Sequence, residues 1–168
     1  MSRRWLVVGV CVLVLAGGAE WLRRLAQAPG GTDAQQILAQ IERGQQAAEQ
    51  RNVGALMRIV SPAYKDDSGM VTRPALSYQV REQLREAQQL EVTIPMSALH
   101  IDVAPNGREA TVTGHMELRI TGQQGDVRTV TLSPTLSWRK EPVRRYLVFP
   151  AEEWRVTKAV GVTPGESE

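Results

Sequence analysis

The sequence predicts an α+β domain in which three N-terminal helices pack on a curved antiparallel sheet, preceded by an N-terminal hydrophobic helix. Three observations support this prediction. The chain starts with a short basic segment followed by an apolar run. Apolar residues recur at helical spacing up to about residue 90 and alternate with polar residues after it. Helices followed by a series of strands are typical of domains whose helices cover one face of an antiparallel sheet.

The first 25 residues are predicted to form a signal peptide or a transmembrane anchor. Arg3 and Arg4 lie close to the start of the chain, and residues 6–19 form an uninterrupted run of 14 apolar and glycine residues. This run is shorter than the roughly 20 residues that a spanning helix needs. Trp5 and Trp21 bracket it, as interfacial aromatic residues bracket membrane spans. We favour an anchor through residues 5–22, which places the following domain outside the cytoplasm.

The alternative is a signal peptide that is removed. Small residues at the end of the apolar run permit cleavage after Gly18 or Ala19, which would release a secreted or periplasmic protein. In either case we expect a linker over residues 26–32, a folded domain over residues 33–161 and a flexible tail over residues 162–168.

Charge and cysteine content narrow the class of the domain. The chain has 20 basic and 18 acidic residues. Four of the basic residues and one acid precede residue 33, so the domain itself carries a net charge of −1. This balance does not indicate a nucleic-acid binder, which concentrates lysine and arginine on one surface. The only cysteine, Cys11, lies in the apolar run, so the domain can form neither an internal disulfide nor a thiolate metal site.

Three helices are expected before residue 90. The first begins at Thr32, where Gln35 completes a capping-box pattern. The second spans residues 53–60. The third is capped by Thr72 and has Pro74 in its first turn, where proline is tolerated. The positions that recur at helical spacing are Ala34, Ile37, Leu38, Ile41, Gln45 and Ala48 in the first helix, Leu56, Met57 and Val60 in the second, and Leu76, Val80, Leu84 and Ala87 in the third.

Two alternating segments follow the helices. Apolar residues occupy even positions in residues 92–96 and odd positions in residues 99–103. This change of parity predicts a bulge or bend near Ser97-Ala98. The sequence Pro105-Asn106-Gly107 predicts a tight hairpin turn directly after the second segment.

The clearest strand spans residues 110–120. Its even positions are apolar or glycine, whereas His115, Glu117 and Arg119 belong to the opposite face. Pro134 marks a kink or an edge in the next strand, because proline cannot donate to a strand ladder. We expect turns at residues 122–126 and 141–144, and extended segments at residues 130–138, 146–149 and 154–158.

Four short segments carry a resemblance to a known superfamily. They are residues 44–52 (GQQAAEQRN), 53–56 (VGAL), 61–66 (SPAYKD) and 153–157 (EWRVT). Together they resemble the nuclear transport factor 2-like superfamily, and the resemblance covers roughly residues 33–161. It implies a cone of three helices and a bent, cystatin-like sheet. The superfamily includes ketosteroid isomerase-like and polyketide cyclase-like enzymes and also binding and assembly domains without catalysis, so the fold alone does not choose between these activities.

The loop after the second helix holds the candidates for catalysis, Tyr64 and Asp66. Asp66 could act as a base at the mouth of the cone, or could bind a cation together with Asp67. Turn chemistry is favoured instead, because an aspartate ahead of Gly69 satisfies loop amides. The spacing does not fit an EF-hand, since Tyr64 and Ala75 stand where that motif needs acids. We therefore expect no catalytic residue, no metal and no cofactor.

The apolar faces of the two clearest strands contain no acid, base or phenol, which argues against acid–base catalysis within a cone. Met116, Leu118, Trp138 and Trp154 are the candidates for lining a ligand pocket. We expect a membrane-tethered extracytoplasmic domain that binds a protein or a ligand without catalysis, and whose sheet could form a homodimer or partner interface. The alternatives are a small-molecule enzyme of the isomerase or cyclase type and a carrier of apolar ligands.

Overall fold

The computed structural model describes residues 32–95, 99–145 and 149–161. The predicted anchor, the bulge expected at Ser97-Ala98 and the tail from residue 162 lie outside these ranges. Within the described ranges, no helix combines the length and the apolar character that crossing a bilayer requires.

Helix α3 (Asp33–Glu49) begins at the predicted capping box. The amide of Gln35 donates to Thr32 Oγ1 at 3.4 Å, and the amide of Thr32 donates to Gln35 Oε1 at 2.9 Å. Ala34, Leu38 and Gln45, which were expected on the buried stripe, are only half-buried. Gln45 Nε2 donates to the carbonyl of Val92 at 2.9 Å. The buried face consists of Ile37, Ile41, Gly44, Ala47 and Ala48.

Helices α4 (Val53–Ile59) and α5 (Arg73–Glu86) also form where the sequence predicts them. Asn52 caps α4, since its side-chain oxygen accepts a hydrogen bond from the Ala55 amide at 3.0 Å. Thr72 occupies the N-cap position of α5 as predicted, but its side chain makes no capping hydrogen bond. The predicted apolar positions of both helices are buried: Leu56, Met57, Val60, Leu76, Val80 and Leu84.

The strands form two antiparallel sheets. One sheet has the order β1-β4-β5 and the other the order β2-β3-β6-β7. Three pairs of consecutive strands are hairpin neighbours, namely β2-β3, β4-β5 and β6-β7. The predicted Pro105-Asn106-Gly107 turn joins β2 to β3, with Gly107 at a φ of 62°. The bounds are β1 Ala87–Thr93, β2 His100–Val103, β3 Glu109–Thr113, β4 Met116–Gly122, β5 Val127–Leu132, β6 Thr135–Arg145 and β7 Phe149–Val160.

Two segments that the sequence predicts as single strands, the second with a kink or an edge at Pro134, are each divided in two. The segment 110–120 is broken at Gly114-His115, and the segment 130–138 at Ser133-Pro134. The breaks lie side by side, because β3 pairs with β6 up to Thr113↔Thr135 and β4 pairs with β5 from Met116↔Leu132. Proline cannot donate to the ladder and glycine weakens a strand, so both segments bend at the same place. The kink predicted at Pro134 is therefore confirmed.

The turn predicted at Glu141–Arg144 is wrong. Strand β6 continues through these residues to Arg145 and pairs with β7 along its whole end, up to Arg145↔Phe149. Pro142 is tolerated because it lies beyond Arg139, the last residue of β6 that pairs with β3, so no hydrogen bond is lost on that side.

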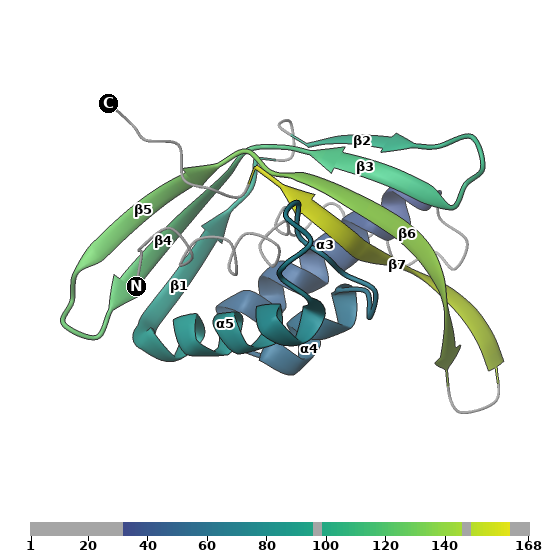
Figure 1. Cartoon of the computed structure of the whole chain (residues 1–168). Helices are drawn as coiled ribbons and strands as arrows, with labels where there is room; N and C mark the ends of the chain where they lie inside the picture. Colours follow the sequence, from purple (N-terminus) through teal and green to yellow (C-terminus); the bar gives the residue numbers. More distant parts are fainter. Residues whose placement is uncertain (1–31, 96–98, 146–148, 162–168) are drawn as a thin grey trace.

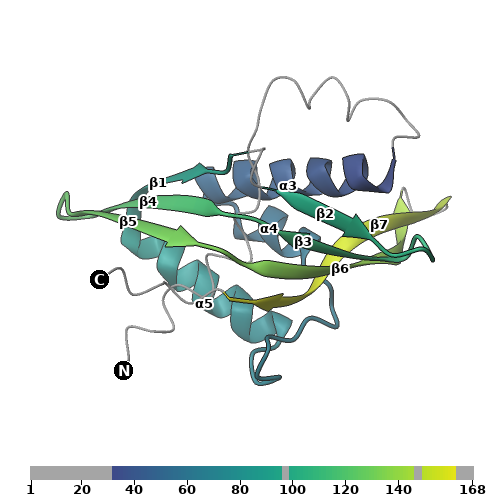
Figure 2. The same cartoon turned by 90° about the horizontal axis from the view of Figure 1, so that it is seen from above.

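The three helices cover the concave face of the arched sheets (Figure 1). Seen from above, α4 lies between α3 and α5 (Figure 2). The core fills the space between helices and sheets, and Trp154 and Tyr64 are its largest fully buried side chains. The outer face is polar, and His115, Glu117 and Arg119 are exposed there as predicted.

Candidate functional site

A cleft of about 250 Å³ opens where the C-terminal end of α5 approaches the sheet β1-β4-β5. We call it the α5 cleft. Its floor is apolar and consists of Leu84 from α5, Leu90 from β1 and Ile120 from β4, together with Ala87 at the junction of α5 and β1. Leu84, Ala87 and Leu90 are buried, so the floor belongs to the core and is held in place by it.

The rim of the α5 cleft is polar. The end of α5 contributes Gln83 and Glu86, and the β4–β5 turn with the start of β5 contributes Gln123, Gln124, Asp126 and Arg128. The Nε of Arg128 lies 3.5 Å from Asp126 Oδ2, and both side chains are largely exposed. Such an ion pair at the surface contributes little to stability, so its two partners can separate at low cost.

The geometry of the β4–β5 turn places Asp126 at the rim. The amide of Gly122 donates to the carbonyl of Asp126 at 2.8 Å, and Gly125 has a φ of 81°, which favours glycine. A Cβ at position 122 would collide with Asp126 Oδ1, so the aspartate side chain folds closely over Gly122. The turn also contacts α5, because Gln123 Nε2 donates to the carbonyl of Arg85 at 3.4 Å.

The four residues predicted to line a ligand pocket do not lie at this cleft. Met116, Leu118 and Trp154 are at most 1% exposed and Trp138 is 2% exposed, and all four belong to the hydrophobic core. Trp138 also borders a second, polar groove of about 350 Å³ on the sheet β2-β3-β6-β7. The Nε1 of Trp154 lies 3.4 Å from Asp33 Oδ1, to which it donates.

The loop after α4 uses Asp66 to hold its own shape. Oδ1 accepts a hydrogen bond from the Val71 amide at 3.0 Å, and Oδ2 accepts one from the Ser68 hydroxyl at 2.7 Å. Burial by itself would raise the pKa of Asp66, but hydrogen bonds from Ser68 and from the Val71, Met70 and Gly69 amides outweigh it, and the pKa is lowered. A carboxylate with a lowered pKa and both oxygens engaged is a poor general base near neutral pH.

Tyr64 lies beneath this loop and is 1% exposed. Burial, followed by the negative charge of Asp66, raises the pKa of the phenol, which therefore stays protonated. Its hydroxyl finds no hydrogen-bond partner among the described residues. Tyr64 and Asp66 are thus close enough to interact, but one is enclosed in the core and the other is bound to the loop.

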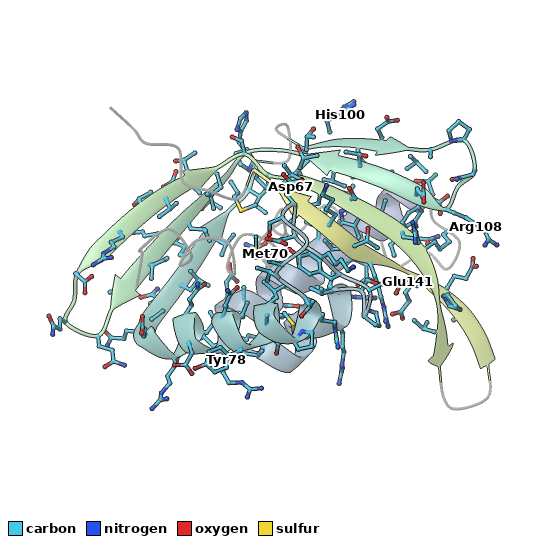
Figure 3. The ribbon with its side chains drawn as sticks, in the orientation of Figure 1. Asp67, Met70, Tyr78, His100, Arg108 and Glu141 are labelled. Carbon is cyan, nitrogen blue, oxygen red and sulfur yellow. The ribbon has the colours of Figure 1, made fainter. Side chains whose placement is uncertain are left out.

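Asp67 pairs with a residue of strand β7 and does not form a site with Asp66. Its carboxylate lies 2.8 Å from Lys158 Nζ on β7, and both side chains are substantially exposed. Figure 3 shows Asp67 and Met70 on the loop in front of β7. The described part of the chain contains no group of three or more His, Cys, Asp or Glu side chains that could hold a metal ion.

Two partly buried polar clusters were not foreseen from the sequence. In one, Lys140 Nζ lies 2.6 Å from Asp33 Oδ1 and 5.2 Å from the centre of the Trp154 ring. In the other, the hydroxyl of Ser61 donates to Glu141 Oε1 at 2.5 Å. Their partners are 107 and 80 positions apart in the chain, so no local motif could reveal them. Ser61 is 0% exposed, which excludes it as a nucleophile for an external substrate in this conformation.

The residues of the α5 cleft were also missed as a site, although several of them were predicted individually. Leu84 and Ala87 belong to the predicted buried stripe of the third helix, and residues 122–126 are the predicted turn. What the sequence does not show is that these segments meet, which depends on the pairing of Ala87 with Gly122 between β1 and β4.

No protein-family model matches the chain, and no curated protein matches it by sequence. Solved structures do match it. One is a nuclear transport factor 2-like superfamily protein from Salmonella enterica, with a TM-score of 0.61 and 14% identity over 81% of this chain and 94% of the other. Another is a proposed dehydratase of the same family from Streptomyces avermitilis, with a TM-score of 0.60 and 13% identity over 76% of this chain and 93% of the other.

A third match is a proposed calcium/calmodulin dependent protein kinase II association domain from Xanthomonas campestris. It has a TM-score of 0.58 and 14% identity, over 78% of this chain and 87% of the other. One of these neighbours is described as an enzyme and another as an association domain, so the likeness concerns architecture and leaves the activity open. The helices, the bent sheet and these matches together show that the chain has the nuclear transport factor 2-like fold.

Proposed function

We propose that the chain is a membrane-tethered, extracytoplasmic domain that binds a small, largely apolar molecule in the α5 cleft and performs no chemistry on it. The observation that carries this proposal is the cleft itself, which combines an apolar floor of Leu84, Leu90 and Ile120 with a polar rim. Ligand sites typically have this composition, with apolar walls and a few polar groups that orient the ligand.

The placement of the charged groups supports binding without catalysis. The carboxylates of the cleft, on Glu86 and Asp126, belong to exposed residues, whereas Leu84, Ala87 and Leu90 of the floor are buried. A general acid or base has to reach the reacting atoms of a bound substrate. Asp66, the carboxylate on which an isomerase- or cyclase-type reaction would depend, is engaged by Ser68 and Val71.

The membrane tether and the extracytoplasmic location rest on the sequence of residues 5–22. Binding of a second copy or of another protein through the outer face of the sheet stays a prediction. The large hydrophobic side chains most exposed among the described residues are Met70, Tyr78 and Val127, which lie on a loop, on α5 and on β5. Figure 3 shows Tyr78 on the side of α5 that faces away from the sheet.

Ligand binding is tested with the full chain in detergent micelles and short-chain hexanol as probe. We expect methyl NMR signals of Leu84, Leu90 and Ile120 to shift on titration, and that of Val127, on the other face of β5, to stay in place. Ile120→Trp should fill the cleft and abolish the shifts, whereas the control Val127→Trp should leave them. Unchanged cleft methyls, or equal shifts in both variants, would refute the proposal.

The tether is tested by fractionation of the source cells and N-terminal sequencing. We expect the intact chain in the membrane fraction, with the domain accessible to protease added from outside the cytoplasmic membrane. A soluble exported protein whose N-terminus follows Gly18 or Ala19 would show that the segment is a cleaved signal peptide instead.

A further inference from the structure

We infer that the occupant of the α5 cleft is a small organic cation, with an ammonium group at the rim and an apolar body against Leu84, Leu90 and Ile120. This inference rests on the proposed function and deepens it by naming the class of ligand. It follows from the charges and the hydrogen-bonding groups that line the cleft.

The lining of the α5 cleft contains more negative than positive charge. Its charged residues are Glu86, Asp126 and Arg128, which together carry a net charge of −1. Arg128 is paired with Asp126 at 3.5 Å. Among the described residues, Glu86 makes neither an ion pair nor a side-chain hydrogen bond, so its carboxylate is the charged group of the lining that has no direct partner.

The end of helix α5 lies at this rim, and its partial charge is partly compensated there, since Arg51 Nη1 donates to the carbonyl of Ala87 at 3.1 Å. Glu86 is the last residue of the helix, where the aligned peptide dipoles place a partial negative charge. Cations are stabilised near a helix C-terminus and anions are not. An ammonium group offers only donors, and the rim offers acceptors from carboxylates and from the side-chain amides of Gln83, Gln123 and Gln124.

An anionic ligand would fit the same cleft less well. Arg128 is the only cation that lines it among the described residues, and an anion could use it only by competing with Asp126. An anion would also lie close to Glu86 and to the end of α5. The floor does not distinguish a cationic from an anionic ligand, because its apolar side chains bind the hydrocarbon part of either one.

The test compares three probes of equal chain length, hexylammonium, hexanoate and hexanol, by methyl NMR titration of the full chain. We expect hexylammonium to bind most tightly and hexanoate most weakly. Glu86→Gln should weaken hexylammonium binding about two- to five-fold, as expected for one exposed charge pair, and leave hexanol binding unchanged. The control is Glu91→Gln, because Glu91 is exposed on β1 and does not line the α5 cleft.

Arg128→Gln provides a test of opposite sign. It frees the carboxylate of Asp126, so hexylammonium should bind more tightly and hexanoate more weakly than in the wild type. Tighter binding of hexanoate than of hexylammonium, or equal effects of Glu86→Gln and Glu91→Gln, would overturn the assignment of a cation while leaving the cleft as a binding site. If none of the three probes shifts a cleft methyl, the proposed function itself fails.

Discussion

Lys140 Nζ on β6 and Asp33 Oδ1 at the start of α3 lie 2.6 Å apart, and this ion pair joins the first turn of the first helix to the long arm of the sheet. Lys140 also lies over the Trp154 ring at 5.2 Å, a cation–π arrangement. The side chains of Lys140 and Asp33 are 17% and 29% exposed, so water screens this pair less than it screens pairs on the open surface.

Asp33→Asn is expected to lower the free energy of unfolding by about 1–3 kcal/mol, because it leaves the Lys140 ammonium partly buried without a counter-charge. Asp67→Asn serves as the control. Asp67 pairs with Lys158 at 2.8 Å, but both side chains are exposed, at 65% and 45%, and we expect a loss below about 0.5 kcal/mol. Urea unfolding measures both values, and equal losses would show that burial of the first pair is unimportant.

The pH dependence of stability should depend on Asp66. Its pKa is lowered in the folded state from the ordinary value of 3.8. Its contribution to stability is therefore fully present above about pH 5 and is lost as the pH falls below 3.8 through the folded value. We expect the unfolding free energies of the wild type and Asp66→Asn to differ at pH 6 and to converge on acidification towards pH 2. If the unfolding free energies of the two proteins keep a constant difference down to pH 2, the loop hydrogen bonds of Asp66 do not cause the pH dependence.

Tyr64→Phe is expected to leave stability unchanged or to raise it by up to about 1 kcal/mol. The phenol is buried and its hydroxyl has no partner among the described residues, so removing the oxygen removes an uncompensated desolvation cost. Thermal unfolding compares it with Tyr78→Phe, in which the exposed hydroxyl is lost instead. A clear destabilisation by Tyr64→Phe alone would reveal a partner for the hydroxyl.

The N-cap residues of α4 and α5 should respond differently to substitution. Asn52→Ala removes the hydrogen bond to the Ala55 amide and should cost about 1 kcal/mol. Thr72→Ala removes a side chain that makes no capping hydrogen bond and should cost less than about 0.5 kcal/mol. Denaturant unfolding of the two variants side by side provides the check, and similar losses would show that Thr72 does cap α5 in solution.

Local patterns in the sequence were sufficient to locate the helices. The Thr32–Gln35 capping box and the period of apolar residues act within a few positions of the chain, so they can be read without knowing the fold. The hairpin at Pro105-Asn106-Gly107 is equally local, because the positive φ at Gly107 is a property of the turn itself.

Local patterns did not locate all of the breaks and ends of the strands. Alternation continues unbroken through Gly114, so the sequence predicts one strand over residues 110–120, although it divides into β3 and β4. The kink at Pro134 was predictable, because proline cannot donate to the ladder. The sequence predicts a turn at residues 141–144 and separate extended segments at residues 146–149 and 154–158, but β6 and β7 pair through Pro142 and Pro150. Whether a proline breaks a strand depends on which side of it carries a neighbour, and that is a tertiary property.

The sequence by itself thus determined that three helices precede the strands and which positions of α4 and α5 are buried, because caps, turns and hydrophobic periods depend on neighbouring residues. The tether stays a prediction from residues 5–22. Only the tertiary structure decided where the α5 cleft lies. The pairing of Ala87 with Gly122 brings the end of α5 against the β4–β5 turn. The charge at the rim therefore comes from segments that approach each other only when the sheet has formed and bent over the helices.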